Sequence, residues 1–338
     1  MSEAPGPLQA EAARKRRLAL EVAGPFTTDD PADVRWLLCG RGRPVSAGSS
    51  PYAVEVTENR ARVWYQDIER SRIEAEERWE ELGYEPTPYP WFEPLPARPT
   101  HPALASCRRE LGPEEVARYR ASAAAAAQAL VEVLGRLQPA QLELEVAGLL
   151  AGHLQALGFT TPVVLVGGAA RMPVHRHPLP TSAPLGRFAL LAFTAERHGL
   201  YTSMTRIVSF GAPPRDLELR VGAAAEVDAA VLAAARPGRT LGELFGVLAD
   251  AYDAARFPGE WRLHHQGGLT GYKGREVFAT PTGEVVLPPT CAVAFNPSVT
   301  GGGKSEDTAL VTEAGVEVLT RTPALPELQN GRPAIVTL

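Results

Sequence analysis

Four histidines fall in two segments that are rich in proline or glycine. His175 and His177 lie in the sequence MPVHRHP, and His264 and His265 lie in WRLHHQGG. An imidazole can bind a transition metal, and it can act as a general acid or base because its pKa lies close to neutral pH. Functional side chains also concentrate on loops. The residues alone therefore leave three roles open for these histidines, as metal ligands, as acid–base groups or as structural residues.

Two glycine-containing segments have the composition of ligand-binding loops. Trp261–Glu276 contains four glycines, which permit a close approach of the backbone to a ligand or to another strand. Gly301–Thr312 begins with GGGKS but lacks the glycine spacing of a P-loop, so it gives little support for nucleotide binding. The sequence contains no GxSxG or HExxH motif. The acidic side chains near these segments are Glu276, Glu284, Glu306 and Asp307.

Composition excludes several classes of protein. The chain has 338 residues, of which 45% are hydrophobic and 22% are charged, and its formal net charge is −5. These values are typical of a globular protein with one large or two unequal domains. A mildly acidic chain has no electrostatic reason to bind nucleic acid or an anionic membrane. We find no signal peptide and no apolar run of about 20 residues, so a cytoplasmic protein without a membrane span is expected.

The three cysteines, Cys39, Cys107 and Cys291, lie far apart in the sequence. An odd and sparse set gives neither a disulfide framework nor the CxxC spacing of a metal site. We expect them to be buried as small hydrophobic residues in a reducing compartment.

The N-terminal part of the chain predicts a small α/β domain over residues 16–92. Its expected elements are strands at Val34–Cys39, Tyr52–Val56 and Ala61–Tyr65 and a charged amphipathic helix at Ile68–Leu82. Prolines recur between Pro86 and Pro102, and proline removes the backbone donors that regular structure needs. We therefore expect an extended linker there, placed at residues 93–105.

The remainder, residues 106–338, predicts an α+β domain in which a curved antiparallel sheet is flanked by helices. Helical patterns cover Pro113–Leu137, Leu142–Leu157, Val221–Ala235 and Thr240–Ala255. The last opens with Thr240 and Glu243 in capping-box spacing. Strand patterns cover Phe188–Phe193, Leu200–Phe210, Glu284–Leu287, Ala292–Phe295, Thr308–Thr312 and Val316–Thr320, and the last two read as a hairpin.

These segments, in this order, resemble the creatinase/aminopeptidase P/prolidase superfamily, the M24 peptidases with the pita-bread fold. The likeness is carried by HRHPLPTSAPLGRFALLA, HGLYTSMTR, HHQGGLTGYKGRE, VAFNP and SEDTALVTEAGVEVLT, and it covers about residues 110–320. It implies a pita-bread domain over 106–338, preceded by a shortened creatinase-type N-terminal domain. Members of this superfamily are commonly dimers, so a homodimer is expected.

Active members of the superfamily hold two divalent metals with two Asp, one His and two Glu. Position by position, four of these ligands fall on Ala192, Ser203, Gly268 and Asn296, and the fifth is kept as Glu306. Neutral side chains cannot hold two like-charged cations side by side, because a dinuclear centre needs bridging carboxylates. The resemblance therefore implies a chain without this metal centre, and no metal or other cofactor is expected.

What the resemblance leaves is a ligand pocket. The candidate catalytic residues are His175, His264 and Glu306, and the candidate ligand-binding residues are Arg275, Tyr272, Asn296 and His177. Arg275 stands where active peptidases carry a second His, and a guanidinium suits a carboxylate such as the C-terminus of a short peptide. We predict a non-metallopeptidase that binds a peptide-like or amino-acid-like small molecule.

Three alternatives remain at this point, and they leave open whether the protein is an enzyme. The first is a metal-independent C–N hydrolase of creatinase type with His175 as general base and His264 polarising the substrate. The second is a residual Xaa-Pro aminopeptidase or dipeptidase, and the third is a purely structural or interaction role. Arg206 is a candidate structural partner of Asp307 or Glu306. One of His264 and His265 is expected to face away, because neighbouring side chains alternate along an extended segment.

Overall fold

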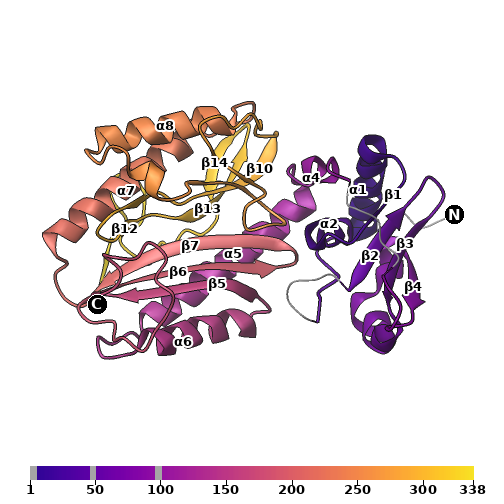
Figure 1. Ribbon diagram of the computed structural model, residues 1–338, viewed down its shortest axis with the longest axis horizontal. Coiled ribbons are helices and arrows are strands. Elements are labelled where there is room, and N and C mark those ends of the chain that lie inside the picture. The colour runs from indigo at the N-terminus through magenta and orange to yellow at the C-terminus, as the bar shows by residue number, and fades with distance from the viewer. Residues whose placement is uncertain (1–5, 46–50, 96–100) are drawn as a thin grey trace. The chain divides into compact units, whose positions relative to one another are not determined.

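The computed structural model describes residues 6–45, 51–95 and 101–338, and it divides the chain into two compact units (Figure 1). The first unit runs to Arg118 and includes His198–Leu200, and the second comprises Tyr119–Arg197 and Tyr201–Leu338. Residues 96–100 of the expected linker lie outside the described residues. Across the three described ranges, no helix combines the length and the apolar character needed to cross a membrane. All three cysteines are buried, as expected.

The first unit contains a four-stranded sheet in the order β1-β2-β3-β4. Its strands are β1 (Phe26–Thr28), β2 (Tyr52–Val56), β3 (Ala61–Gln66) and β4 (Glu85–Tyr89). The expected strands at 52–56 and 61–65 are confirmed. Pro86 and Pro88 were expected in a linker, but they lie in β4, which pairs in parallel with β3. Proline is tolerated there because β4 is an edge strand, where a missing N–H breaks no central ladder.

Two other expectations for this unit are wrong. Most of the segment Val34–Cys39 lies in helix α2 (Pro31–Leu37) and not in a strand. The Asp30 carboxylate caps this helix by accepting hydrogen bonds from the backbone N–H groups of Ala32 (2.9 Å) and Asp33 (3.2 Å). The expected helix at Ile68–Leu82 is a series of short turns, η1 (Asp67–Glu69), α3 (Arg70–Arg72), η2 (Ile73–Glu77) and η3 (Trp79–Leu82). It is interrupted where Arg78 adopts a φ of +47°.

The second unit begins with a helix pair packed on a sheet of order β15-β7-β6-β5. Side chains such as Leu130, Leu150 and Phe193 are at most 1% exposed and form the core between the helices and this sheet. Its elements are α5 (Pro113–Leu134, from Tyr119 in this unit), α6 (Glu143–Ala156), β5 (Thr160–Gly168), β6 (Phe188–Arg197), β7 (Leu200–Ser209) and β15 (Val336–Thr337).

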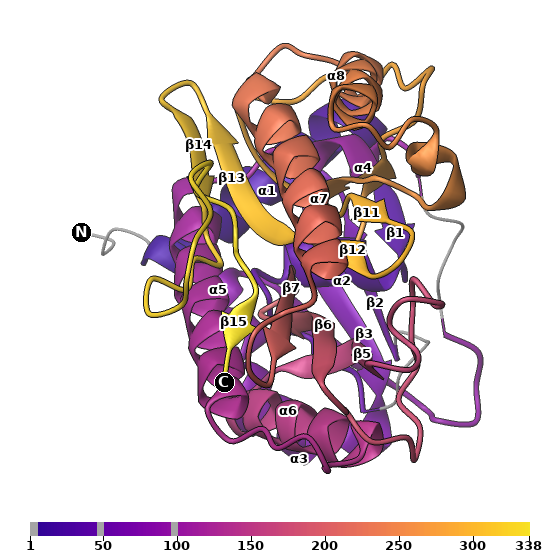
Figure 2. The ribbon, with the colours of Figure 1, turned by 90° about the vertical axis from the view of Figure 1, so that its left-hand side faces the viewer.

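A second helix pair covers a second sheet, of order β14-β13-β10-β8-β9 (Figure 2). Its core contains Leu244, Tyr252 and Val293, each fully buried. The elements are α7 (Arg215–Ala234), α8 (Leu241–Ala254), β8 (Gly267–Thr270), β9 (Val277–Phe278), β10 (Thr290–Phe295), β13 (Asp307–Thr312) and β14 (Gly315–Val318). The capping box of α8 is confirmed, because Thr240 Oγ1 accepts from the Glu243 N–H at 3.1 Å. The remaining elements are η4 (Glu260–Leu263) and a two-stranded sheet of β11 (Ser298–Val299) and β12 (Gly303–Lys304).

The α+β class is thus confirmed, but three local expectations failed. Strand β5 was not expected, and neither was β8, which was treated as part of a glycine-rich loop. The segment Glu284–Leu287 forms no strand and contributes one isolated bridge, between Val286 and Thr240. Glycine-rich and short strands carry weak periodicity, so pairing within the sheet and not local sequence decides them.

Acidic pH should weaken the first unit through Glu11. The Glu11 carboxylate of α1 (Pro7–Ala23) accepts two hydrogen bonds from Arg118, both 2.7 Å, and lies 2.7 Å from Lys15 Nζ. Burial raises the pKa of Glu11, but Arg118 and Lys15 outweigh it and lower the pKa to about 2. A depressed folded-state pKa stabilises the protein above the unfolded value of 4.5, and this contribution is lost as the pH falls towards 2.

We therefore expect wild type to exceed Glu11→Gln in stability by on the order of 3 kcal/mol at pH 7. The difference should shrink below pH 4.5. Urea unfolding at a series of pH values measures it. Glu21→Gln, which removes an exposed carboxylate of the same helix, is the control. A difference between wild type and Glu11→Gln that does not vary with pH would contradict this account.

Candidate functional site

Strand register brings three predicted segments together at one end of β10. Phe295 pairs with Gly267 on one side and with Asp307 on the other. The residues just beyond this row are Asn296 and Glu306, so they become neighbours although they come from separate strands. Strand β7 joins the group because the Thr205 N–H donates to the Glu306 carbonyl at 3.0 Å.

These residues surround a cavity of about 460 Å³, which we call the Glu306 cavity. Its lining residues include His177, Ala192, His265, Arg275, Phe278, Asn296, Lys304 and Glu306. The structure therefore brings together four of the residues expected at the site from the sequence, namely His177, Arg275, Asn296 and Glu306, with the expected degenerate metal position Ala192.

Both carboxylate oxygens of Glu306 are occupied by protein groups. Arg275 Nη2 donates to Oε1 at 2.9 Å, and Thr205 Oγ1 donates to Oε2 at 3.0 Å. Lys304 Nζ lies 3.8 Å from Oε2. Arg275 also reaches Ser203 Oγ at 3.3 Å, which places the expected position Ser203 behind the guanidinium. Glu306, Arg275 and Lys304 are all nearly buried, so the two cations depend on the single Glu306 carboxylate for charge compensation.

The neighbouring carboxylate, Asp307, belongs to a different network. Side chains alternate along a strand, so Asp307 points away from Glu306. It binds Arg206 Nη2 at 3.0 Å and also pairs with Arg332. Arg332 in turn donates from Nε to Asp228 Oδ2 at 2.8 Å. Arg206 therefore pairs with Asp307 and not with Glu306, and this buried network holds β7, β13 and α7 together.

A cluster of three histidines stands beside the Glu306 cavity. His177 Nε2 and His264 Nε2 are 2.8 Å apart. The rings of His264 and His265 stack at 4.4 Å between centroids and 25° between planes, and His265 also packs edge-on against Phe278. The expectation that His264 and His265 face opposite ways is wrong, because both rings approach His177.

The surroundings of the three histidines favour their neutral forms. Loss of hydration and the charge of Lys304 lower the pKa of His264 to about 2. Loss of hydration, with Arg275 and Lys304, lowers the pKa of His265 to about 4, and the pKa of His177 is lowered as well. Burial also lowers the pKa of Lys304, although Glu306 opposes this shift.

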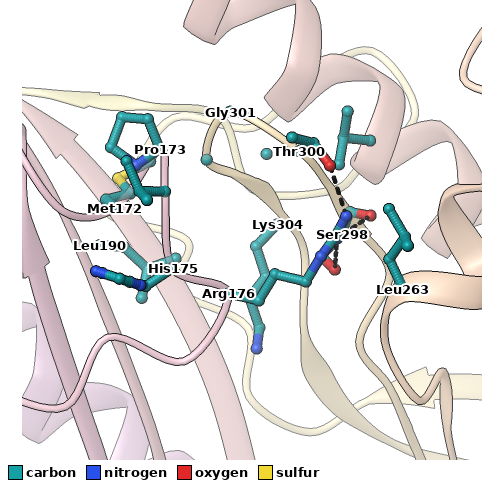
Figure 3. A pocket seen from close by; sticks show the side chains of 14 residues that line it. Met172, Pro173, His175, Arg176, Leu190, Leu263, Ser298, Thr300, Gly301 and Lys304 are labelled. Carbon is teal, nitrogen blue, oxygen red and sulfur yellow. Dashed lines mark hydrogen bonds between the residues drawn. The ribbon is translucent and has the colours of Figure 1, made fainter.

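His175 lies apart from these groups. It lines an adjoining cavity of about 230 Å³ with Met172, Leu190 and the glycine segment 301–303 (Figure 3). Lys304 lines both cavities. Tyr272 is buried, and His264 stands next to the Glu306 cavity without lining it. The predicted residues His175, His264 and Tyr272 are therefore not among the residues that line this cavity.

Two residues that matter here were not among the candidates. Lys304 was visible in GGGKSED, but that segment was judged only against phosphate loops. Arg176 fixes the loop that carries His175 and His177, because it donates to Ser298 Oγ and to Thr300 Oγ1, both at 2.7 Å, and forms an ion pair with Glu260. Figure 3 shows the hydrogen bonds from Arg176 to Ser298 and Thr300. Nothing in the sequence HRHP signals this anchoring role.

Comparison with known proteins gives the family. A sequence model of metallopeptidase family M24 matches residues 117–313, more than half of the chain. The chain belongs to metallopeptidase family M24. No curated protein matches the sequence.

Solved structures show that this M24 chain has the fold of complete family members. Dipeptidase PepE from Mycobacterium ulcerans is similar with a TM-score of 0.74 and 19% identity, over 98% of this chain and 99% of that one. Xaa-Pro dipeptidase from Bacillus anthracis has a TM-score of 0.71 and 18% identity, over 98% of this chain and 100% of that one. X-Pro aminopeptidase from Thermotoga maritima MSB8 has a TM-score of 0.75 and 15% identity, over 97% of this chain and 99% of that one. These likenesses confirm the expected pita-bread fold.

Gly268 of this M24 chain has no room for a side chain. Its φ is +148°, and a Cβ there would lie 2.2 Å from the Val277 carbonyl oxygen and 2.8 Å from the Ala279 nitrogen. Both atoms belong to the backbone of the adjacent strand and its continuation, so they cannot move aside cheaply. Gly271, three residues on, has a side-chain atom of Glu276 at 3.7 Å as its nearest neighbour.

We therefore expect Gly268→Ala to lower the free energy of unfolding by about 3 kcal/mol, through overpacking and backbone strain. Gly271→Ala should cost less than about 1 kcal/mol. Urea unfolding measures the free energy of unfolding of the two variants. Equal values would contradict the prediction, because they would show that the backbone of β9 can move to make room for a side chain at 268.

Proposed function

We propose that this M24 protein binds a carboxylate-bearing amino-acid-like or peptide-like molecule in the Glu306 cavity and does not hold the dinuclear metal centre of the family's peptidases. The observation that carries the proposal is that protein groups occupy the Glu306 carboxylate. Arg275, Thr205 and Lys304 already engage its carboxylate, and two of these three groups are cations.

The residues present do not fit a dinuclear centre. The positions that correspond to the family's other ligands are Ala192, Ser203, Gly268 and Asn296, and none of them supplies a charge or an imidazole. Gly268 cannot even accept a Cβ without a shift of the backbone. Two divalent cations would also be repelled by Arg275 and Lys304, which stand on either oxygen of the one carboxylate that remains.

The same cations favour an anionic ligand. Arg275 and Lys304 together carry more positive charge than Glu306 can compensate, and all three line the cavity. A guanidinium presents a planar fork that matches a carboxylate, and an ammonium adds a point charge. The charge of this cavity therefore suits the carboxylate of an amino acid or the C-terminus of a short peptide.

The rest of the cavity suits the remainder of such a molecule. Asn296 lines the wall, and its Oδ1 has no hydrogen-bond partner among the described residues, so it can accept from a ligand amide or ammonium. Val163 and Phe278 also line the wall and are 40% and 46% exposed, which offers an apolar surface to a ligand side chain. A C–N hydrolase with His175 as base has less support, because His175 lines the adjoining cavity.

Metal analysis tests the first half of the proposal. The purified protein should carry less than one equivalent of Mn, and calorimetric titration should show no tight binding of two Mn²⁺ ions. Addition of Mn²⁺ should not produce cleavage of the dipeptide Ala-Pro. Two tightly bound Mn²⁺ ions, or Mn²⁺-stimulated cleavage, would overturn the proposal in favour of a residual Xaa-Pro peptidase.

Ligand titration tests the second half. Ala-Pro with a free carboxylate should bind wild type more tightly than its C-terminal amide, because the amide cannot pair with Arg275. Arg275→Gln should reduce the affinity for Ala-Pro at least tenfold and abolish the preference for the free acid. Arg262→Gln, which removes an exposed guanidinium of the preceding segment, is the matched control and should bind as wild type does. Equal affinity for acid and amide in wild type would contradict the carboxylate assignment.

The homodimer and the cytoplasmic location stay predictions. Light scattering coupled to size-exclusion chromatography measures the first, with a mass of twice 36.2 kDa expected.

A further inference from the structure

We propose that His177, His264 and His265 form a binding site for one transition-metal ion, with Zn²⁺ as the best fit, beside the Glu306 cavity. Its three imidazole ligands differ from the carboxylate-rich ligand set of the family's dinuclear centre. It takes up the first of the three roles that the sequence left open for these histidines, and it does not depend on the proposed ligand.

The three side chains converge closely enough to share one ion. One ligand nitrogen from each ring lies within 4.8 Å of the other two. Nitrogens that bind Zn²⁺ at about 2.0–2.1 Å in tetrahedral geometry lie about 3.4 Å apart. The contact between His177 Nε2 and His264 Nε2, at 2.8 Å, must therefore open slightly, while the remaining distances close. These are side-chain adjustments that leave the backbone in place.

The backbone positions of two of the histidines are fixed by buried or well-bonded neighbours. The His264 carbonyl accepts from Gln266 Nε2 at 2.7 Å, and Gln266 is fully buried and bound by Tyr252. His177 follows directly after Arg176, which is anchored to Ser298, Thr300 and Glu260. The third ring, that of His265, is held between His264 and Phe278. A site held in this way loses little conformational entropy when a metal binds.

The chemistry of the donors selects the metal. Three neutral imidazoles suit Zn²⁺, Cu²⁺, Ni²⁺ or Co²⁺, whereas Mn²⁺, Mg²⁺ and Ca²⁺ prefer oxygen ligands. Lys304, Arg275 and Arg176 oppose a further cation, and Glu306 and Glu260 offset them in part, so a micromolar and not a picomolar affinity is expected.

The arrangement leaves a metal with an open coordination position. Three protein ligands are the number found in catalytic and ligand-binding zinc sites, in which the fourth position is free. His177 and His265 both line the Glu306 cavity, so a ligand held there by Arg275 lies on the same side as the free position. The metal would thus form part of the wall that a bound molecule contacts.

Calorimetric titration of the full chain with Zn²⁺ at pH 7.5, without an affinity tag, tests the site. One ion per chain is expected. His177→Ala and His265→Ala should each reduce the affinity at least tenfold, with unchanged circular dichroism spectra. His153→Ala, which removes a histidine of α6, and His175→Ala, whose ring lines the adjoining cavity, should bind Zn²⁺ as wild type does. Co²⁺ should give visible absorption bands of a low-coordinate nitrogen site, and these should be lost in His177→Ala.

Absence of Zn²⁺ binding by wild type would overturn the inference, and so would binding that survives both His177→Ala and His265→Ala. Failure of the zinc site and failure of the proposed function can be told apart. Arg275→Gln should weaken Ala-Pro binding and leave the Zn²⁺ stoichiometry at one, whereas tight binding of two Mn²⁺ ions that depends on Glu306 would contradict the proposed function and not the histidine site.

Discussion

The arrangement of this protein depends on a buried carboxylate that must be neutralised. Glu306 stands where the sheet containing β7 meets the sheet containing β13, and it is 5% exposed. A charge in that position is tolerated only when opposite charges and hydrogen-bond donors surround it. Arg275 and Lys304 supply the opposite charges here, and Thr205 donates a hydrogen bond. These contacts hold the junction of the two sheets together and set the charge of the cavity wall.

Much of this architecture can be predicted from the sequence, and the failures have physical causes. Helix α8 was predicted because its capping box is a local signal. Strands β6 and β7 and the β13–β14 hairpin were predicted because short runs rich in apolar and β-branched residues, bounded by turn residues, favour strands. Helix α2 was mistaken for a strand because a short apolar run fits both states, and the Asp30 cap decides between them. Strand β8 was missed because glycine has a low strand propensity. Its pairing with β9 and β10 is a tertiary feature that the local sequence does not show.

The candidate site shows the same division. The family resemblance grouped Glu306, Asn296 and Arg275 in one pocket, and these residues line one cavity, because the pairing of β10 with β8 and β13 brings their segments together. Which of His175 and His177 lines the Glu306 cavity depends on how Arg176 anchors their loop to Ser298. The sequence HRHP does not reveal this tertiary contact. The stacking of His264 on His265 likewise depends on Phe278 and on the end of η4 at Leu263, where the chain changes direction. Local alternation is a poor guide at such a point.

The confined backbone at Gly268 bears on the history of the chain. A single substitution could place a larger side chain at Ala192, since that residue lines an open cavity. A side chain at 268 would instead require the main chain from Val277 to Ala279 to move first. Each change that packs this segment more tightly makes such a substitution more costly. The backbone around Gly268 therefore acts as an evolutionary constraint, because it limits which side chains a single substitution can add here, whereas Ala192 leaves that choice open.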